Sequence, residues 1–261
     1  MRGDRYEVLN FGISNFGVGQ YLLVWEHYVR RFAPDYVFVF VAGLQMDRTV
    51  SKFEMGGFDS SRRKHLSVRP VFRLEGDRLI LEKARDFDEF VKVQHDLVQK
   101  EFHGSRMRKR QAGFVLGALP SLLNKGLQIL QRRLESAGNL PPERIVDEGT
   151  VRVNLKIIER LNQSVRKTGG KLIVVDAVRY LGGAKKLSYN LRNFCMEQGL
   201  GYVPLSDDLL AANREGTSTR WRYDLHFNEA GNRLFADAMY RWVIRDAEAG
   251  EASRLRVHHG P

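Results

Sequence analysis

Apolar residues recur along the chain with two different periods, and these periods predict helices and strands in turn. A spacing of three and four residues, as in Val18, Leu22, Trp25 and Val29, indicates a helix with one buried face. On this basis we expect helices at 18–32, 86–103, 112–136, 148–168, 184–198, 206–213 and 228–246. Short apolar runs rich in β-branched and aromatic residues predict strands. These strands are expected at 7–13, 36–42, 68–74, 78–82, 172–178 and 202–205.

Two of these runs indicate how the strands pair. Residues 36–42 and 172–178 are apolar at consecutive positions, which is typical of parallel strands buried on both faces. Strands that alternate with helices predict an α/β fold, a three-layer α/β/α sandwich around a parallel sheet. Reactive groups in such sheets lie beyond the carboxyl ends of the strands. A site is therefore expected in the loops at 12–19, at 42–48 and around His226.

The predicted elements form one domain, residues 1–246, with two insertions. Polar and basic residues at 51–67 predict a loop, and a hairpin follows around Glu75-Gly76-Asp77, so that 51–83 is the first insertion. Residues 88–147 are a second, helical insertion. The polar residues 247–261 predict a mobile tail.

Composition and charge narrow the classes of partner. The 261 residues carry a formal net charge of +11 and one cysteine, which excludes an internal disulfide and a cysteine-rich metal site. Basic clusters at 62–64, 106–110 and 132–133 are either solvated surfaces or contacts for an anionic surface or polymer. Neither a zinc-finger spacing nor an aromatic-interleaved basic motif accompanies them, which argues against nucleic acid as the partner. No apolar run approaches the ~20 residues of a transmembrane segment.

The segment 223–232 holds the clearest chemistry in the sequence. Asp224 and His226 stand two residues apart, and Asn228 and Gly231 follow at the start of the last predicted helix. A carboxylate beside an imidazole fixes its tautomer and stabilises the imidazolium, so the pair predicts the acid/base half of a nucleophilic hydrolase. In the alternative interpretation, Asp224 only caps a turn and His226 is a polar surface residue.

The sequence predicts neither a cofactor nor a metal. The glycine-rich segment 12–19 follows a strand and opens a helix, but it lacks the G-x-G-x-x-G spacing of a dinucleotide site. Its backbone N–H groups are better suited to face a developing oxyanion. The remaining histidines show no metal-ligand spacing, and no H-E-x-x-H motif is present.

Three segments, in this order, resemble the SGNH (GDSL-type) hydrolase family: VLNFGISNFGVGQ at 8–20, PDYVFVFVAG at 34–43 and YDLHFNEAGNRLFADAMYRWV at 223–243. The sequence RPVFRLEGDRLILE at 69–82 is similar to a hairpin of bacterial members. The resemblance implies a flavodoxin-like α/β/α sandwich and hydrolysis of esters or thioesters, including polysaccharide deacetylation, by a Ser-His-Asp triad. It also implies that His226 is the general base and Asp224 its orienting acid.

The sequence departs from the family at the oxyanion positions. Asn15 stands where the family has its oxyanion glycine, and its N–H can still donate a hydrogen bond. Leu44 replaces the oxyanion asparagine and cannot donate from its side chain, which leaves the neighbouring Gln45 as a substitute. Ser14 is a weak alternative nucleophile, because its position matches the residue before the oxyanion glycine rather than the nucleophile.

The family's nucleophile follows a central strand that precedes the strand matching 7–13. Here only Gly3-Asp4 occurs in that region, and Arg5 follows it instead of serine. We therefore expect this sequence to be an N-terminally truncated form that lacks the first, central strand and is inactive as it stands.

The first hypothesis is an esterase or acetylesterase that acts on an acylated polysaccharide or another O-acyl ester. The alternative hypothesis is a non-catalytic binding or accessory protein of the same fold, for a carbohydrate or an anionic partner. The sequence leaves the compartment open between the cytoplasm and the cell envelope.

Overall fold

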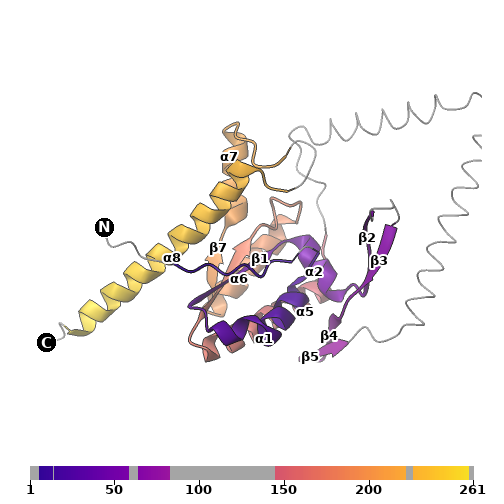
Figure 1. The fold of residues 1–261 in the computed structure, drawn as a ribbon, viewed down its shortest axis with the longest axis horizontal. Coiled ribbons are helices and arrows are strands. Elements are labelled where there is room, and N and C mark those ends of the chain that lie inside the picture. The colour runs from indigo at the N-terminus through magenta and orange to yellow at the C-terminus, as the bar shows by residue number, and fades with distance from the viewer. Residues whose placement is uncertain (1–5, 14, 59–63, 83–144, 222–225, 259–261) are drawn as a thin grey trace, which may run out of the picture.

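The computed structural model describes residues 6–13, 15–58, 64–82, 145–221 and 226–258 (Figure 1), and for 53–58, 64–68 and 250–258 it describes the backbone alone. The predicted helices 86–103 and 112–136 lie outside these residues. No helix within the described ranges is long and apolar enough to cross a membrane.

A small parallel sheet forms the centre of the molecule, as the apolar runs predicted. Its strands are β1 (Tyr36–Val41), β6 (Lys171–Asp176) and β7 (Gly201–Val203), in the order β1-β6-β7. Both strand pairs are parallel, with Tyr36 opposite Lys171 at the start of the β1–β6 ladder.

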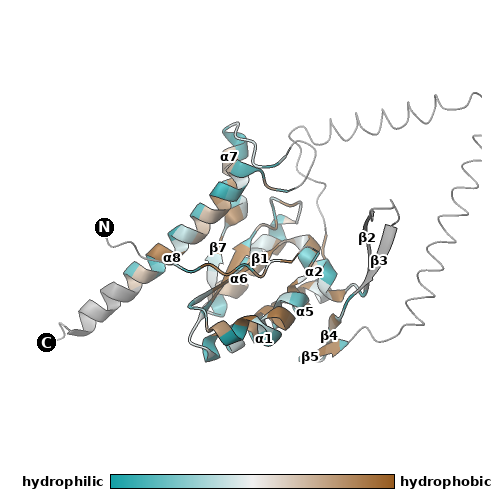
Figure 2. Ribbon diagram, viewed as in Figure 1, coloured by the Kyte–Doolittle hydropathy of each residue, from teal (hydrophilic) through white to brown (hydrophobic). Residues whose placement is uncertain are grey.

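Helices cover both faces of this sheet, which gives a mixed α/β architecture compatible with an α/β/α layout (Figure 1). The first face packs against α1 (Val18–His27), α5 (Glu148–Lys167) and α6 (Lys185–Glu197). The second face packs against α7 (Leu205–Arg214) and α8 (Glu229–His258). In Figure 2, apolar and polar residues alternate along α1 and α5, as expected for helices with one face on the core.

Alternate residues of each strand divide between the two cores because successive side chains point to opposite faces of a sheet. Leu172 and Val174 of β6 lie in the core under α1, α5 and α6. Ile173 and Val175 lie in the core under α7 and α8. All four are at most 2% exposed, so β6 is the buried central strand.

The prediction of a strand at 7–13 is wrong. Within the described residues, β1 pairs only with β6, and residues 6–13 run without strand pairing. Val8 is 86% exposed and Ile13 is 53% exposed. A strand needs a neighbouring strand for its backbone hydrogen bonds. No described strand adjoins this apolar segment, so it does not form a strand.

The predicted helix 18–32 divides into two parts. α1 ends at His27, Tyr28 departs from helical geometry with φ −127°, and a 3₁₀-helix η1 (Val29–Phe32) follows. Ala33 then turns in the left-handed region with φ 44°, directly before Pro34.

The predicted loops at 42–48 and 51–67 are also wrong, because both contain regular structure. Residues after β1 form a short helix, α2 (Gly43–Val50), which buries Met46 and Thr49. Antiparallel strands β2 (Phe53–Phe58) and β3 (Lys64–Val68) then pair with a register shift. β2 and β3 form because their backbones pair with each other, although the polar residues at 51–67 show no alternating pattern that would predict strands.

The later hairpin is confirmed as β4 (Val71–Glu75) and β5 (Arg78–Glu82), with Gly76 in the left-handed region at φ 60°. The last helix is longer than predicted, since α8 continues to His258 through the residues assigned to a tail. Residues 247–258 are helical because Ala, Glu, Arg and Leu in this stretch all favour helix. The mobility of the tail stays a prediction.

Candidate functional site

His226 lies on the exposed loop that precedes α8, at the carboxyl end of β1. The next residue, Phe227, fixes this position, because its ring packs against rings on three different elements. The centroid of Phe227 lies 6.3 Å from that of Phe40 in β1, 5.8 Å from Tyr180 and 6.4 Å from Phe235 in α8. An exposed imidazole next to a partly buried aromatic anchor is accessible to a ligand and still held in place.

Backbone contacts close the loop on either side of residues 222–225. Arg220 and Phe227 form an antiparallel bridge, and the N–H of Trp221 donates to the carbonyl of His226 at 3.2 Å. The N–H of Asn228 donates to the carbonyl of Thr219, also at 3.2 Å. The backbone at His226 is therefore part of a small paired turn.

Asn228 caps α8, as its place in the sequence indicated. Its Oδ1 accepts from the N–H of Gly231 at 3.0 Å, and its Nδ2 donates to the carbonyls of Ser218 and Arg220 at 2.8 and 3.2 Å. A Cβ on Gly231 would lie 2.2 Å from the carbonyl oxygen of Thr219. A side chain at position 231 would therefore clash with the backbone of Thr219, and only glycine fits there.

Tyr180, in the loop between β6 and α6, packs against this turn from the side of the core. It is fully buried, and its hydroxyl shares a hydrogen bond with the hydroxyl of Thr219. Thr219 in turn donates to Asn213 Oδ1 at 2.9 Å. The guanidinium of Arg220 lies 4.2 Å from the Tyr180 ring centroid, and its Nη2 donates to the carbonyl of Tyr180 at 3.3 Å.

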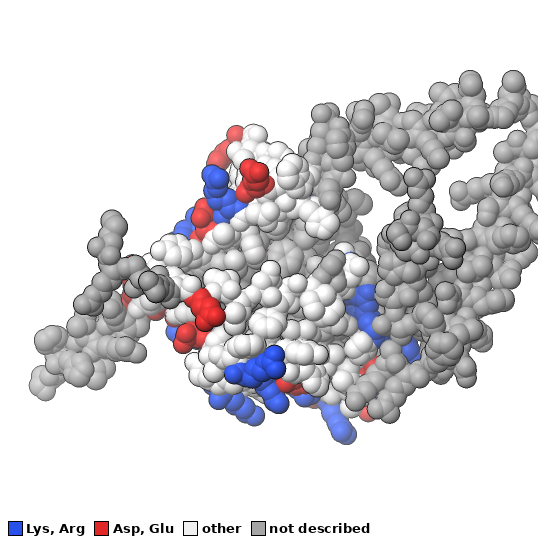
Figure 3. All heavy atoms as spheres, in the orientation of Figure 1, with Lys and Arg blue, Asp and Glu red and all other residues white. Residues whose placement is uncertain are grey.

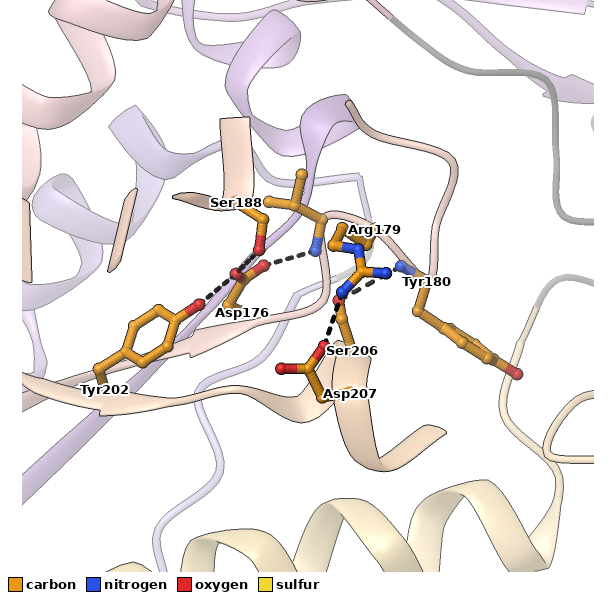
Figure 4. A network of polar contacts seen from close by, with 8 residues as sticks. Asp176, Arg179, Tyr180, Ser188, Tyr202, Ser206 and Asp207 are labelled. Carbon is orange, nitrogen blue, oxygen red and sulfur yellow. Dashed lines mark hydrogen bonds and ion pairs between the residues drawn. The ribbon is translucent and has the colours of Figure 1, made fainter. Parts of the chain in front are cut away.

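The loop that holds Tyr180 is itself fixed by a buried carboxylate, Asp176, at the carboxyl end of β6 (Figure 4). Asp176 accepts from the backbone N–H of Val178 at 2.7 Å, from Tyr202 Oη at 2.5 Å and from the Ser188 hydroxyl. Burial and the negative charge of Asp176 raise the pKa of Tyr202 far above its ordinary value, so its phenol stays protonated and donates.

Two further contacts tie the same loop to α7. The N–H of Tyr180 donates to Ser206 Oγ at 3.2 Å, and Arg179 Nη1 lies 2.8 Å from Asp207 Oδ1 (Figure 4). The sequence interpretation missed Asp176 and Tyr180. An acidic residue that ends a fully apolar strand is the signal that could have drawn attention to Asp176.

Of the residues predicted for the site, Asp224 and Ser14 lie outside the described residues. The structure therefore describes His226 but not the proposed pair with Asp224. Within the described ranges, no group of three or more His, Cys, Asp or Glu side chains is arranged to hold a metal ion.

Asn15 adopts the left-handed conformation, with φ 64°, and both of its oxygen atoms accept hydrogen bonds from arginines. Arg48 Nη2 donates to its Oδ1 at 2.9 Å, and Arg69 Nη1 donates to its carbonyl at 3.1 Å. A glycine stands at such positions without steric cost, and asparagine is among the residues that tolerate them.

Gln45 and Leu44 lie in the first turn of α2, beyond the carboxyl end of β1. The backbone N–H of Gln45 donates to the carbonyl of Ala42 at 3.1 Å, whereas its side-chain Oε1 is buried and has no hydrogen-bond partner within the described residues. Leu44 is 38% exposed. The structure thus places both His226 and the first turn of α2 beyond the carboxyl end of β1.

Comparison of the chain with protein-family models, with curated proteins and with solved structures found no match in any of the three.

Proposed function

We propose that this chain belongs to an SGNH-type ester hydrolase in which His226 is the general base. The substrate class is a small O-acyl ester, such as an acetylated carbohydrate. One observation carries the proposal: an exposed histidine held by the Phe227 anchor at the carboxyl end of a parallel strand. This is where α/β proteins place their reactive groups.

The chemistry assigned to His226 is proton transfer. The neutral imidazole removes the proton from a serine hydroxyl as the oxygen attacks the ester carbonyl, and the carbonyl becomes a tetrahedral oxyanion. The imidazolium then returns the proton to the leaving alcohol, which leaves an acyl-serine. Water activated by the same imidazole releases the acid and restores the serine.

The architecture supports the finer fold assignment as well. The parallel order β1-β6-β7, with helices on both faces, agrees with the flavodoxin-like arrangement that the resemblance implies. The tightly packed start of α8, with Asn228 as cap and Gly231 against Thr219, gives a physical reason for the residues that follow the histidine in the motif.

The test uses the protein encoded by the full reading frame, with p-nitrophenyl acetate as substrate and a fluorophosphonate as serine-directed label. General base catalysis contributes about 10²–10⁴-fold, so His226→Ala should lower kcat/KM by that factor. His27→Ala, which removes an exposed histidine at the end of α1, should leave the rate unchanged.

Two results would count against this assignment. Unchanged hydrolysis in His226→Ala would remove the histidine from the mechanism. Loss of both hydrolysis and labelling in Ser14→Ala, with the fold intact, would make Ser14 the nucleophile and change the assignment of that loop.

A second candidate function is a non-catalytic binding module of the same fold. It is favoured by the oxyanion region, where Leu44 presents an exposed apolar side chain and Asn15 is held by two arginines. Absence of both ester hydrolysis and fluorophosphonate labelling in the full reading frame would decide for this function.

A further inference from the structure

The paired turn before α8 brings an exposed indole next to the imidazole of His226. Arg220 and Phe227 are directly opposite each other in an antiparallel bridge. Trp221 and His226 are the next opposite pair, and the N–H of Trp221 donates to the carbonyl of His226 at 3.2 Å. Directly opposite residues project their side chains from the same face, with Cβ atoms about 4.5–5.5 Å apart. The two rings are therefore neighbours.

The two pairs of side chains point to opposite sides of the turn, because successive side chains in an extended chain alternate. The Arg220 guanidinium lies 4.2 Å from the Tyr180 ring centroid, and the Phe227 centroid lies 5.8 Å from it. Since Tyr180 is fully buried, this pair faces the core. Trp221 and His226 consequently face the solvent, and Trp221 is 57% exposed while His226 is exposed as well.

The exposure of this indole distinguishes it from the other two tryptophans of the chain. Trp25 is 2% exposed, and Trp242 packs edge-on against Tyr36 and Phe38. An exposed indole leaves a large apolar surface in contact with water, and covering it with a ligand is favourable. Figure 3 shows few charged side chains on the described surface between α7 and α2. Such a surface suits a neutral ligand better than an ion.

We propose that Trp221 binds the sugar ring of a carbohydrate ester and so holds the ester group beside His226. The C–H groups on one face of a pyranose ring carry partial positive charge and are attracted to the negative π-face of an indole. The hydroxyl groups at the edge of the sugar ring stay in water. A simple alkyl ester has no such face. This role for Trp221 rests on the proposed function of His226, and it restricts the substrate class to carbohydrate esters.

Iodide quenching of tryptophan fluorescence tests the binding without catalysis. The full chain is titrated with cellotriose and with N-acetylated chitotriose, two neutral sugars whose pyranose rings carry C–H groups on both faces. At least one of them should reduce the quenching saturably in the millimolar range, because it covers Trp221. The reduction should be absent in Trp221→Phe, since Trp25 is buried and Trp242 is packed against other rings.

Two fluorescence results overturn the proposal. Quenching of the parent that neither sugar changes means that no sugar covers the indole. An equal reduction in Trp221→Phe means that the sugar acts at another part of the chain.

Hydrolysis of glucose pentaacetate and of ethyl acetate by the protein encoded by the full reading frame tests the selectivity. Trp221→Ala should raise KM for the acetylated sugar about tenfold, which equals about 1.4 kcal/mol. Its kcat should stay within about twofold, because binding energy that substrate and transition state share changes KM alone. Hydrolysis of ethyl acetate should not change. Tyr189→Ala, which removes a 63% exposed aromatic side chain on α6, should leave both substrates unaffected.

Circular dichroism should first establish that each variant is folded, and Trp221→Phe, with its smaller ring, replaces Trp221→Ala if the latter is not. Equal losses with both esters overturn the role in selectivity, because Trp221 would then only support His226. If the parent hydrolyses neither ester, the proposed function fails, and the fluorescence titration alone decides whether Trp221 binds a sugar.

Discussion

At the residue scale, the position of His226 depends on the partly buried Phe227 and the fully buried Tyr180. Phe227 and Tyr180 pack their rings 5.8 Å apart beneath the loop, and the Tyr180 hydroxyl is bound to Thr219. The backbone carbonyl of Thr219 also accepts a hydrogen bond from the N–H of Asn228. Thr219 therefore connects the β6–α6 loop, through its hydroxyl, to the cap of α8, through its carbonyl. The imidazole is exposed, but its support is part of the core.

Tyr180→Phe is the variant that isolates this support. Removing one buried hydroxyl should lower the free energy of unfolding by about 1–2 kcal/mol, because Thr219 loses a partner while the ring contacts remain. Urea denaturation measures this loss. The matched variant Tyr189→Phe, at a residue 63% exposed on α6, should stay within about 0.5 kcal/mol of the parent. Equal stability of the two variants would show that the Tyr180–Thr219 contact stabilises nothing.

The residues that the sequence could identify here are those whose role is local. Asn228 and Gly231 were recognisable because a helix cap and its glycine are separated by a fixed number of positions. The place of Asp176 at the end of an apolar strand was visible in the sequence, but its partners were not, since Ser188 and Tyr202 stand 12 and 26 positions further along the chain. Only the fold brings those donors to one carboxylate.

At the scale of elements, α5 is a helix whose start is fixed by a neighbouring residue in the sequence, and this can be tested. Asp147 caps it by accepting the Thr150 N–H at 2.9 Å, and Thr150's side-chain and backbone hydrogen bonds lower the pKa of this carboxyl. A depressed folded-state pKa stabilises the protein above the carboxyl's ordinary pKa, and this contribution disappears as the pH falls through the depressed value.

Asp147→Ala should therefore lower the urea midpoint at pH 7, and the difference from the parent should narrow at acidic pH. Urea titrations at several pH values measure it. Glu197→Ala provides the control. Glu197 is exposed and is the last residue of a different helix, α6, so its carboxyl caps no helix N-terminus. A midpoint difference for Asp147→Ala that stays constant down to strongly acidic pH would contradict the capping role.

Elements with their own periodic pattern were predictable, and elements that depend on a partner were not. The 20-residue α5 and the apolar β6 follow from periodicity and burial. The strands β2 and β3 were taken for a loop because each is defined by the other. For residues 7–13 the error is the reverse: a strand was predicted from the apolar composition, but no described strand lies beside this segment to pair with it.

At the scale of the whole molecule, the described part of the parallel sheet has one well-buried central strand and two edge strands, of which β1 is the one next to the candidate site. β6 lies between β1 and β7, and β1 has no partner within the described residues on its other side. Val39 and Val41 of β1 are nonetheless buried on one face, and Phe40 packs against Phe227 on the other. The carboxyl end of this edge strand is also where the candidate site lies.

Amide hydrogen exchange measured residue by residue tests this arrangement. In a parallel strand, successive N–H groups point alternately to the two neighbours, so a strand paired on one side protects only alternate amides. We expect slow exchange throughout Leu172–Val175 of β6, and an alternation of slow and fast exchange along Val37–Phe40 of β1. Uniformly slow exchange in both strands would contradict an edge position for β1. If such protection increased with protein concentration, the edge would be paired with a second copy of the chain, and the candidate site would then form at an interface.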